Sequence, residues 1–249
     1  MRASIFKHTA IMMALAWSFY SCSEKDMSDI MPEENNDTQL WDYPVKPGTE
    51  EWKQFQSNEE KVRACQIPEE VLDSLSTEDL TDLCLRYPLL VDVFAFNFVN
   101  MGLDKLFSDF NGIRALYNRE TEDVSRILIQ RYIHKIQSLS LLDKEDSNLE
   151  KFNLIISISV LEVLFSRIEL RANESDEILK ELLKALVSGY EEEKKYPDYF
   201  QFYEPNFFAR ANLIYKICEQ CLEKSLAMNN HFNNEERELI NRLSYQLIK

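Results

Sequence analysis

The chain has 249 residues, a formal net charge of −15 and only four glycines. The acidic excess repels phosphate backbones and no cluster of Lys or Arg offsets it, so nucleic acids are excluded as expected partners. Sheets and tight hairpins consume glycine, and four glycines against a usual share of about 7% favour helices joined by short links.

Residues 1–21 have the order of a bacterial export signal. Two basic residues precede an apolar run over residues 9–20, and small Ser21 stands directly before Cys22. The run is too short to cross a bilayer as a helix. A cysteine in this place predicts cleavage before Cys22 and attachment of lipid to it; the alternative is an ordinary secretory signal with Cys22 left as a thiol. Cleavage removes two positive charges and leaves 228 residues with a net charge of −17.

Residues 22–56 are predicted to form a flexible acidic tether. Acidic and amide side chains are followed by Tyr-Pro-Val-Lys-Pro-Gly at residues 43–48, an extended and partly stiff segment. About 30 residues of flexible coil span roughly 30 Å, enough to hold a domain clear of a lipid surface. Trp41 and Trp52 are expected to dock the end of the tether onto that domain.

From Ser57 to Lys249 the apolar residues recur at helical spacing, which predicts one all-helical domain over residues 57–249. Ser57 with Glu60, and Ser76 with Asp79, are typical of helix N-termini with a capping side chain. No fixed repeat period stands out. The prediction is an all-α fold, an irregular multi-helix array resembling a short α-solenoid, with a compact helical bundle as the alternative. The longer helices are expected over residues 122–139, 146–172, 176–195, 206–228 and 234–248.

The helix over residues 146–172 is the most hydrophobic and is expected to be central. Within it, Ser159, Glu162, Ser166 and Glu169 follow one another at three- and four-residue steps. This stripe is interpreted as the solvent-facing side of the helix. The alternative is a buried Glu162 with a raised pKa that serves as a general acid.

Cys218 and Cys221 stand three residues apart within the predicted helix over residues 206–228. Helical spacing places both on one face with apolar residues, so they are expected to be buried free thiols. A zinc site would need two further ligands such as Cys65 and Cys84, which do not form a matching pair. We therefore predict no metal site and no cofactor.

The segment from Tyr196 to Phe208 holds seven aromatic residues in 13 and is punctuated by two prolines. It cannot be a regular helix throughout and is predicted to link two helices. Either its rings pack over one end of the core as a plug, or they form a platform that binds a partner protein or a glycan. The platform residues would be Tyr196, Tyr199, Phe200, Phe202 and Tyr203.

Two segments resemble lipoproteins of Bacteroidota-type bacteria. Residues 23–26, Ser-Glu-Lys-Asp, look like the short acidic stretch that marks surface-exposed lipoproteins, and residues 66–132 resemble predicted lipoproteins of uncharacterised function. The resemblance implies a lipid-anchored outer-membrane protein displayed at the cell surface, or else held on the periplasmic face. It brings no catalytic residues with it.

No catalytic constellation stands out in the sequence. Our first hypothesis is therefore a non-enzymatic surface module, anchored in the membrane through its N-terminal lipid, that binds a partner protein or a glycan. The second is an extracellular hydrolase or lyase with a carboxylate pair, because helices can bring acidic residues together without a sequence signal. The third is an accessory subunit of an envelope complex.

Overall fold

The computed structural model describes residues 41–96, 98–119, 121–141, 148–167, 174–200, 205–227, 229 and 231–249. These residues form helices and contain no strand, which confirms the predicted all-α class. None of the described helices is both long enough and apolar enough to cross a bilayer. In chain order, the elements are α2 (Glu50–Gln54), α3 (Asn58–Ala64), α4 (Glu69–Ser74), α5 (Thr77–Leu85), the 3₁₀ helix η2 (Leu90–Ala95), α6 (Val99–Asp109), α7 (Asn111–Tyr117), α8 (Thr121–Leu139), α9 (Asn148–Phe165), α10 (Asp176–Glu193), α11 (Pro197–Phe200), α12 (Pro205–Ile217), α13 (Lys224–Ala227) and α14 (Asn234–Leu247).

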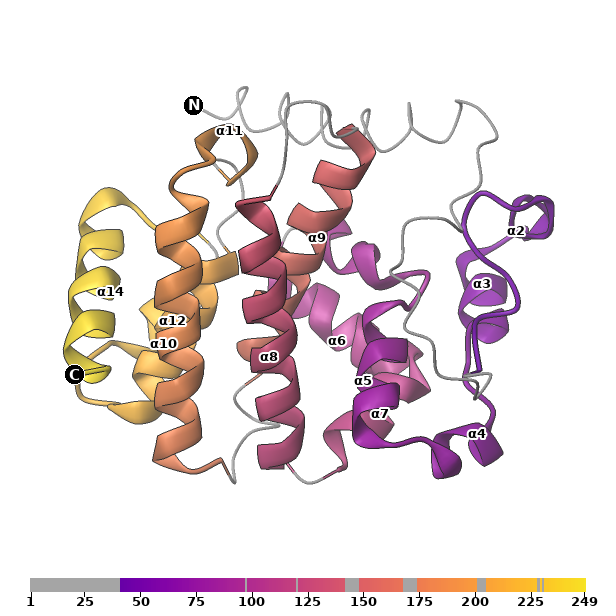
Figure 1. Cartoon of the computed structure of the whole chain (residues 1–249), viewed down its shortest axis with the longest axis horizontal. Coiled ribbons are helices and arrows are strands. Elements are labelled where there is room, and N and C mark those ends of the chain that lie inside the picture. The colour runs from indigo at the N-terminus through magenta and orange to yellow at the C-terminus, as the bar shows by residue number, and fades with distance from the viewer. Residues whose placement is uncertain are drawn as a thin grey trace.

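Four helices, α8, α9, α10 and α12, form the centre of the fold. α8 packs against α9 and α10, and α12 packs against the same two helices from the other side. In Figure 1, α8 and α10 stand side by side, with α14 on one flank and α5, α6 and α7 on the other. α8 and α10 run in the same direction, since Arg126 pairs with Glu181 near their starts and Tyr196 bonds Leu139 at their ends.

α9 is central, as its hydrophobicity predicts. It packs against α8 and α12 and also against α6 and η2. The side chains from Ile158 to Ser166 are all buried, including those on every side of the helix. A helix buried all round contributes apolar area to several neighbours at once, so it holds the flanking helices together.

Two predicted helix starts are confirmed in detail. The Ser57 hydroxyl accepts a hydrogen bond from the Glu60 amide, and the Ser76 hydroxyl accepts one from the Asp79 amide. Each of these bonds satisfies an amide that the first helical turn leaves without a partner, and a serine cap of this kind stabilises a helix by about 1 kcal/mol.

The segment from Trp41 to Gln56 belongs to the folded domain. Tyr43 and Trp52 are buried and the Trp41 ring packs against the core, which confirms the predicted docking of both tryptophans. The Tyr43 hydroxyl donates a hydrogen bond of 2.9 Å to the carbonyl oxygen of Leu83 in α5. The chain therefore enters the core about 15 residues before the domain boundary expected at Ser57.

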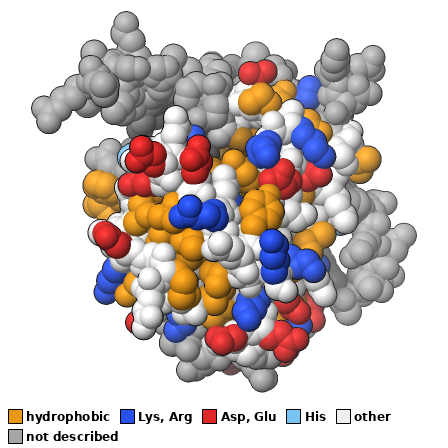
Figure 2. All heavy atoms as spheres, turned by 90° about the vertical axis from the view of Figure 1, so that its left-hand side faces the viewer, with side chains coloured by type: hydrophobic (Ala, Val, Ile, Leu, Met, Phe, Trp, Pro, Cys, Tyr) orange, Lys and Arg blue, Asp and Glu red, His pale blue; other side chains and the backbone are white. Residues whose placement is uncertain are grey.

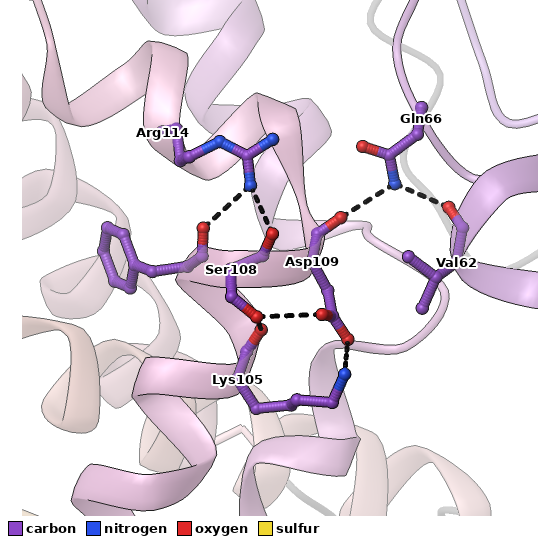
Figure 3. Close-up of polar contacts among 7 residues, drawn as sticks. Val62, Gln66, Lys105, Ser108, Asp109 and Arg114 are labelled. Carbon is purple, nitrogen blue, oxygen red and sulfur yellow. Dashed lines mark hydrogen bonds and ion pairs between the residues drawn. The ribbon is translucent and has the colours of Figure 1, made fainter. Parts of the chain in front are cut away.

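A polar network closes the C-terminal end of α6 (Figure 3). Arg114 donates to the carbonyl oxygens of Phe107 and Ser108, at 2.8 Å each, and Gln66 donates to that of Asp109 at 3.0 Å. These carbonyls lie in the last turn of a helix, where the backbone provides no donor. Because Gln66 follows α3, its bond to Asp109 also joins the link after α3 to the end of α6, 43 positions away.

Asn111 extends this network at the break between α6 and α7. Its side chain accepts a hydrogen bond from the backbone amide of Ile67 at 3.0 Å and donates one to the Ile67 carbonyl oxygen at 2.7 Å. The backbone amide of Asn111 donates to the side-chain oxygen of Gln66. The exchange of both bonds with the Ile67 backbone resembles the pairing of two strand residues. It fixes the link after α3 against the start of α7.

The predicted helix over residues 206–228 is wrong at its C-terminal half. α12 ends at Ile217, and Cys218 and Cys221 form a disulfide in the turn that follows, instead of two free thiols on a continuous helical face. Asn212 donates to the carbonyl oxygen of Ala227 at 2.8 Å, which holds α13 back against α12. Helical periodicity continues through this turn in sequence, but the chain reverses to bury Ala227.

Cys65 and Cys84 are buried free thiols. Burial raises the pKa of Cys65 to about 11, so the thiol stays protonated at neutral pH. Both act as small apolar side chains in the core.

Candidate functional site

A cluster of polar side chains lies inside the four central helices, and each helix contributes to it. Tyr132 comes from α8, Glu162 from α9, Glu193 from the last turn of α10, and Asn206 and Arg210 from α12. The two glutamates are 0% and 6% exposed, and Arg210 is 0% exposed. Ionisable groups this deep are rarely placed without partners.

Glu162 is the centre of the cluster. Its Oε1 atom accepts a hydrogen bond of 2.8 Å from the Tyr132 hydroxyl and one of 2.7 Å from the Asn206 amide group. Asn206 also donates to the Leu186 carbonyl of α10 at 3.0 Å. One carboxyl oxygen thus joins α8, α9 and α12, and the Asn206 amide group adds α10.

The interpretation of Ser159, Glu162 and Ser166 as a solvent-facing stripe is therefore wrong. Ser159 and Ser166 are each 5% exposed, and Glu162 has no exposed surface. Glu162 faces polar groups of α8 and α12, whereas the Ser166 hydroxyl donates to the Val163 carbonyl of α9 itself. Spacing within one helix gives the direction of a polar face but cannot tell which medium lies opposite it.

Glu193 lies close enough to Glu162 for each buried carboxyl group to influence the ionisation of the other. Burial raises the pKa of Glu193 well above its ordinary value, and the neighbouring charge of Glu162 raises it further. Burial also raises the pKa of Glu162, although the bonds from Asn206 and Tyr132 favour its ionised form and oppose that effect. The pair therefore consists of two unequal acids.

Arg210 supplies the positive charge of the cluster. Its Nη1 donates to the side-chain oxygen of Asn241 in α14 at 2.9 Å. The guanidinium group lies 4.5 Å from the ring centre of Tyr190 and 4.6 Å from that of Phe207, within the range of cation–π attraction. Burial lowers the pKa of Arg210, but an arginine side chain remains protonated in proteins.

A surface groove of about 320 Å³ runs between α8 and α10. This volume is at the lower end of the range for ligand pockets. Tyr132 and Gly189 form part of its floor, directly over the polar cluster. Apolar side chains and polar groups alternate around it, notably Ile133, Ile136, Ala185, Gln137, Glu192 and Lys195.

The carboxyl pair converges but does not line this groove. Glu162 and Glu193 are buried, and neither glutamate is among the lining residues. A general acid must come within hydrogen-bond reach of the atom it protonates. A ligand in the groove would contact Tyr132 and Gly189 and would not reach the carboxyl pair. The pair therefore belongs to the interior of the protein and not to the groove.

The aromatic link borders one end of the groove. Tyr196 follows the lining residue Lys195, and its hydroxyl donates to the Leu139 carbonyl at 2.8 Å, next to the lining residue Ser140. Tyr196 and Phe200 pack against the core, whereas Tyr199 is 44% exposed. The other two candidate platform residues, Phe202 and Tyr203, lie outside the described residues.

Exposed apolar side chains lie on the groove wall and on the segments that directly follow α8 and α10. Ile133 on its wall is 42% exposed, Leu141 directly after Ser140 is 79% exposed, and Tyr199 stands on α11 beyond its end. Single exposed apolar residues are ordinary, but three near one groove are suited to anchor a partner.

Figure 2 shows the flank that carries α14, where hydrophobic side chains also reach the surface, interspersed with basic and acidic ones. On α14, Tyr245 is 38% exposed and Leu239, Leu243 and Leu247 are partly buried. The Tyr245 hydroxyl donates to Glu191 of α10, so its polar end already has a partner in the fold.

Sequence reasoning missed Glu193, Asn206 and Arg210 as members of a site. Two signals were present in the sequence. α12 carries Asn206 and Arg210 four residues apart among aromatic and aliphatic neighbours, and Gly189 interrupts a segment that otherwise consists mostly of strong helix formers. Cys22, the predicted lipid attachment site, lies outside the described residues. Within the described residues, no three or more His, Cys, Asp or Glu side chains are grouped so that they could hold a metal ion.

A comparison with protein-family models found no matching family, and comparisons with curated proteins and with solved structures found no match.

Proposed function

We propose that this chain is a lipid-anchored binding module of the bacterial outer membrane, which holds a segment of a partner protein in the groove between α8 and α10. The observation that carries the proposal is the groove with Ile133 exposed on its wall, and with Leu141 and Tyr199 exposed on the segments that follow α8 and α10. A module of this kind needs no catalytic group of its own.

The anchor rests on the sequence. The apolar run, Ser21 and Cys22 follow the order of a lipoprotein signal, and residues 23–26 resemble the stretch that directs lipoproteins to the cell surface. Surface display is the placement we favour over the periplasmic face.

The lining of the groove favours a protein segment over a glycan. Sugar rings stack on exposed aromatic faces, whereas the exposed apolar side chain among the lining residues is the aliphatic Ile133, with Ile136 and Ala185 largely buried beside it. Gln137, Glu192 and Lys195 add donors and acceptors at the rim, as in a protein interface with an apolar centre and a polar edge.

The net charge favours a basic partner. After removal of residues 1–21 the chain carries a formal charge of −17, and charge complementarity speeds encounter and suppresses partners of like charge. The segment that we expect combines leucine or isoleucine anchors with lysine or arginine.

The test uses a library of displayed random peptides, selected on purified protein that carries Cys22→Ala to keep it soluble. We expect enriched peptides with aliphatic anchors and basic residues. Ile133→Glu should weaken their binding at least about tenfold, because a charge on the groove wall would be desolvated by the peptide.

Val91→Glu is the matched control, since Val91 on η2 is 43% exposed and lies away from the groove. If the selected peptides bind Ile133→Glu and Val91→Glu equally well, the groove is not the binding site. If their composition shows no basic residues, the charge argument is wrong.

A further inference from the structure

We propose that the buried cluster is a proton-binding site: Glu193 holds a proton at neutral pH and donates it in a hydrogen bond to the Glu162 carboxylate. The proposal concerns the interior of the four central helices and does not depend on what the groove binds.

The first argument is the charge of the cluster. Two carboxyl groups and one guanidinium group are buried together, and Arg210 can neutralise only one carboxylate. Two ionised glutamates would leave a net negative charge inside the protein, which is strongly unfavourable. One proton makes the cluster neutral as a whole.

The second argument is the count of hydrogen bonds. Among the described residues, the Oε2 atom of Glu162 and the Oε1 atom of Glu193 have no donor. Two ionised carboxylates can only accept, so their contact would leave both oxygens unsatisfied. A proton between the two groups provides one donor and one acceptor, and so satisfies both atoms.

The third argument assigns the proton to Glu193. Glu162 already accepts hydrogen bonds from Tyr132 and Asn206, and such bonds stabilise an ionised carboxylate. Glu193 receives no comparable support, and its pKa is raised well above the ordinary value by burial and by Glu162. The pair then resembles two carboxyl groups that share a proton in an active site, but without access to a substrate.

Other charged and titratable side chains surround the carboxyl pair. α8 provides Tyr132, whose pKa burial raises well above its ordinary value, so it stays a neutral donor. The groups that face the cluster, taken over all the elements packed around it, are Tyr132 of α8, Glu162 of α9, Tyr190, Glu191 and Glu193 of α10, Arg210 of α12, and Arg237 and Tyr245 of α14.

The proposal makes stability depend on pH in a definite direction. A carboxyl group whose pKa is higher in the folded state stabilises the fold fully below its unfolded pKa of about 4.5, and this contribution is lost as the pH rises through the folded value. The melting temperature should therefore fall on the alkaline side.

Glu193→Gln is the central variant, because its amide group can donate to Glu162 as the protonated acid does. We expect its melting temperature to fall less between pH 6 and pH 9 than that of the parent, by at least about 2 °C. Glu181→Gln is the control: it makes the same substitution on the same helix, at a half-exposed ion pair with Arg126.

Infrared spectroscopy gives a readout that packing alone would not change. The parent protein at pH 7 should show a carboxylic-acid band that disappears in Glu193→Gln and persists in Glu181→Gln. Glu162→Gln should remove the band too, since Glu193 would then ionise as the sole counter-charge of Arg210.

The double variant Glu162→Gln/Glu193→Gln leaves Arg210 buried without a counter-charge. We expect it to melt lower than the two single effects added together. A band at pH 7 that survives in Glu193→Gln, or equal pH dependence of Glu193→Gln and Glu181→Gln, would overturn the proposal.

Discussion

The α-carbon of Gly189 lies directly against the hydroxyl group of Tyr132. A β-carbon at position 189 would stand 1.8 Å from the Tyr132 oxygen and 2.6 Å from the ring carbon that bears it. Glycine at this place in α10 is what allows the tyrosine to cross between α8 and α10 and reach Glu162. The floor of the groove and the buried cluster thus share one side chain.

Gly189→Ala should displace Tyr132 and lengthen or break its bond to Glu162. We expect a loss of about 1–3 kcal/mol in the free energy of unfolding, as for other overpacked core positions. Alanine favours the helical state by about 1 kcal/mol over glycine, so the steric cost must exceed this gain before any net loss of stability is measured. Urea unfolding measures the change.

Ser188→Ala, at the exposed neighbouring position of the same helix, is the control for this substitution. It should change stability by less than about 0.5 kcal/mol. A Gly189→Ala protein as stable as Ser188→Ala would show that Tyr132 has room to move.

Arg210→Met should destabilise the protein by about 3–5 kcal/mol, because it leaves the Glu162 charge buried without its counter-charge. The loss should be smaller at low pH, where Glu162 can also take up a proton. Unfolding in denaturant at pH 5 and pH 8 measures the difference. Equal losses at both pH values would mean that Arg210 acts through packing on Tyr190 and Phe207 alone.

Trp52→Ala should cost about 3–5 kcal/mol, the usual range for a buried large aromatic side chain. Trp52 is 5% exposed and its ring packs against Phe55. Thermal or urea unfolding measures the loss. A chain that begins at Ser57 should be destabilised even more, since it also lacks Tyr43. An unchanged stability would support the domain boundary at Ser57 that the sequence predicts.

Reduction of the Cys218–Cys221 disulfide should lower stability by at most about 2 kcal/mol, because the closed loop is only four residues long and constrains the unfolded chain little. A shift of the urea midpoint with added dithiothreitol measures it. The Cys218→Ser/Cys221→Ser protein should show no such shift, and a shift in that variant would point to the buried thiols of Cys65 or Cys84.

Local features of the fold were predictable from the sequence because their causes are local. Ser57 and Ser76 cap their helices through bonds that span three residues, and α9 is central because its own composition leaves little to face water. The burial of residues before Ser57 has a cause that is not local: the Tyr43 hydroxyl bonds the carbonyl oxygen of Leu83, 40 positions away.

The candidate site was not predictable by spacing, since its members come from four helices. Glu162 bonds Tyr132 across 30 positions and Asn206 across 44. Such distances leave no period in the sequence. What the sequence does contain is a polar stripe on an apolar helix, which is consistent with water or with a polar partner opposite it. Only the packing of α8, α10 and α12 around α9 decides between the two.

The point at which the chain enters the core has a mechanical consequence. Tyr43 is bonded to α5, and its ring lies beside Tyr87 and Phe110, which stack at 3.9 Å. Tension along the residues that precede Trp41 would act on this flank of the molecule, whereas α10 and α14 lie toward the other (Figure 1). In the anchored protein that we propose, a pull from the N-terminal side would therefore load the aromatic stack first and reach the far wall of the groove last.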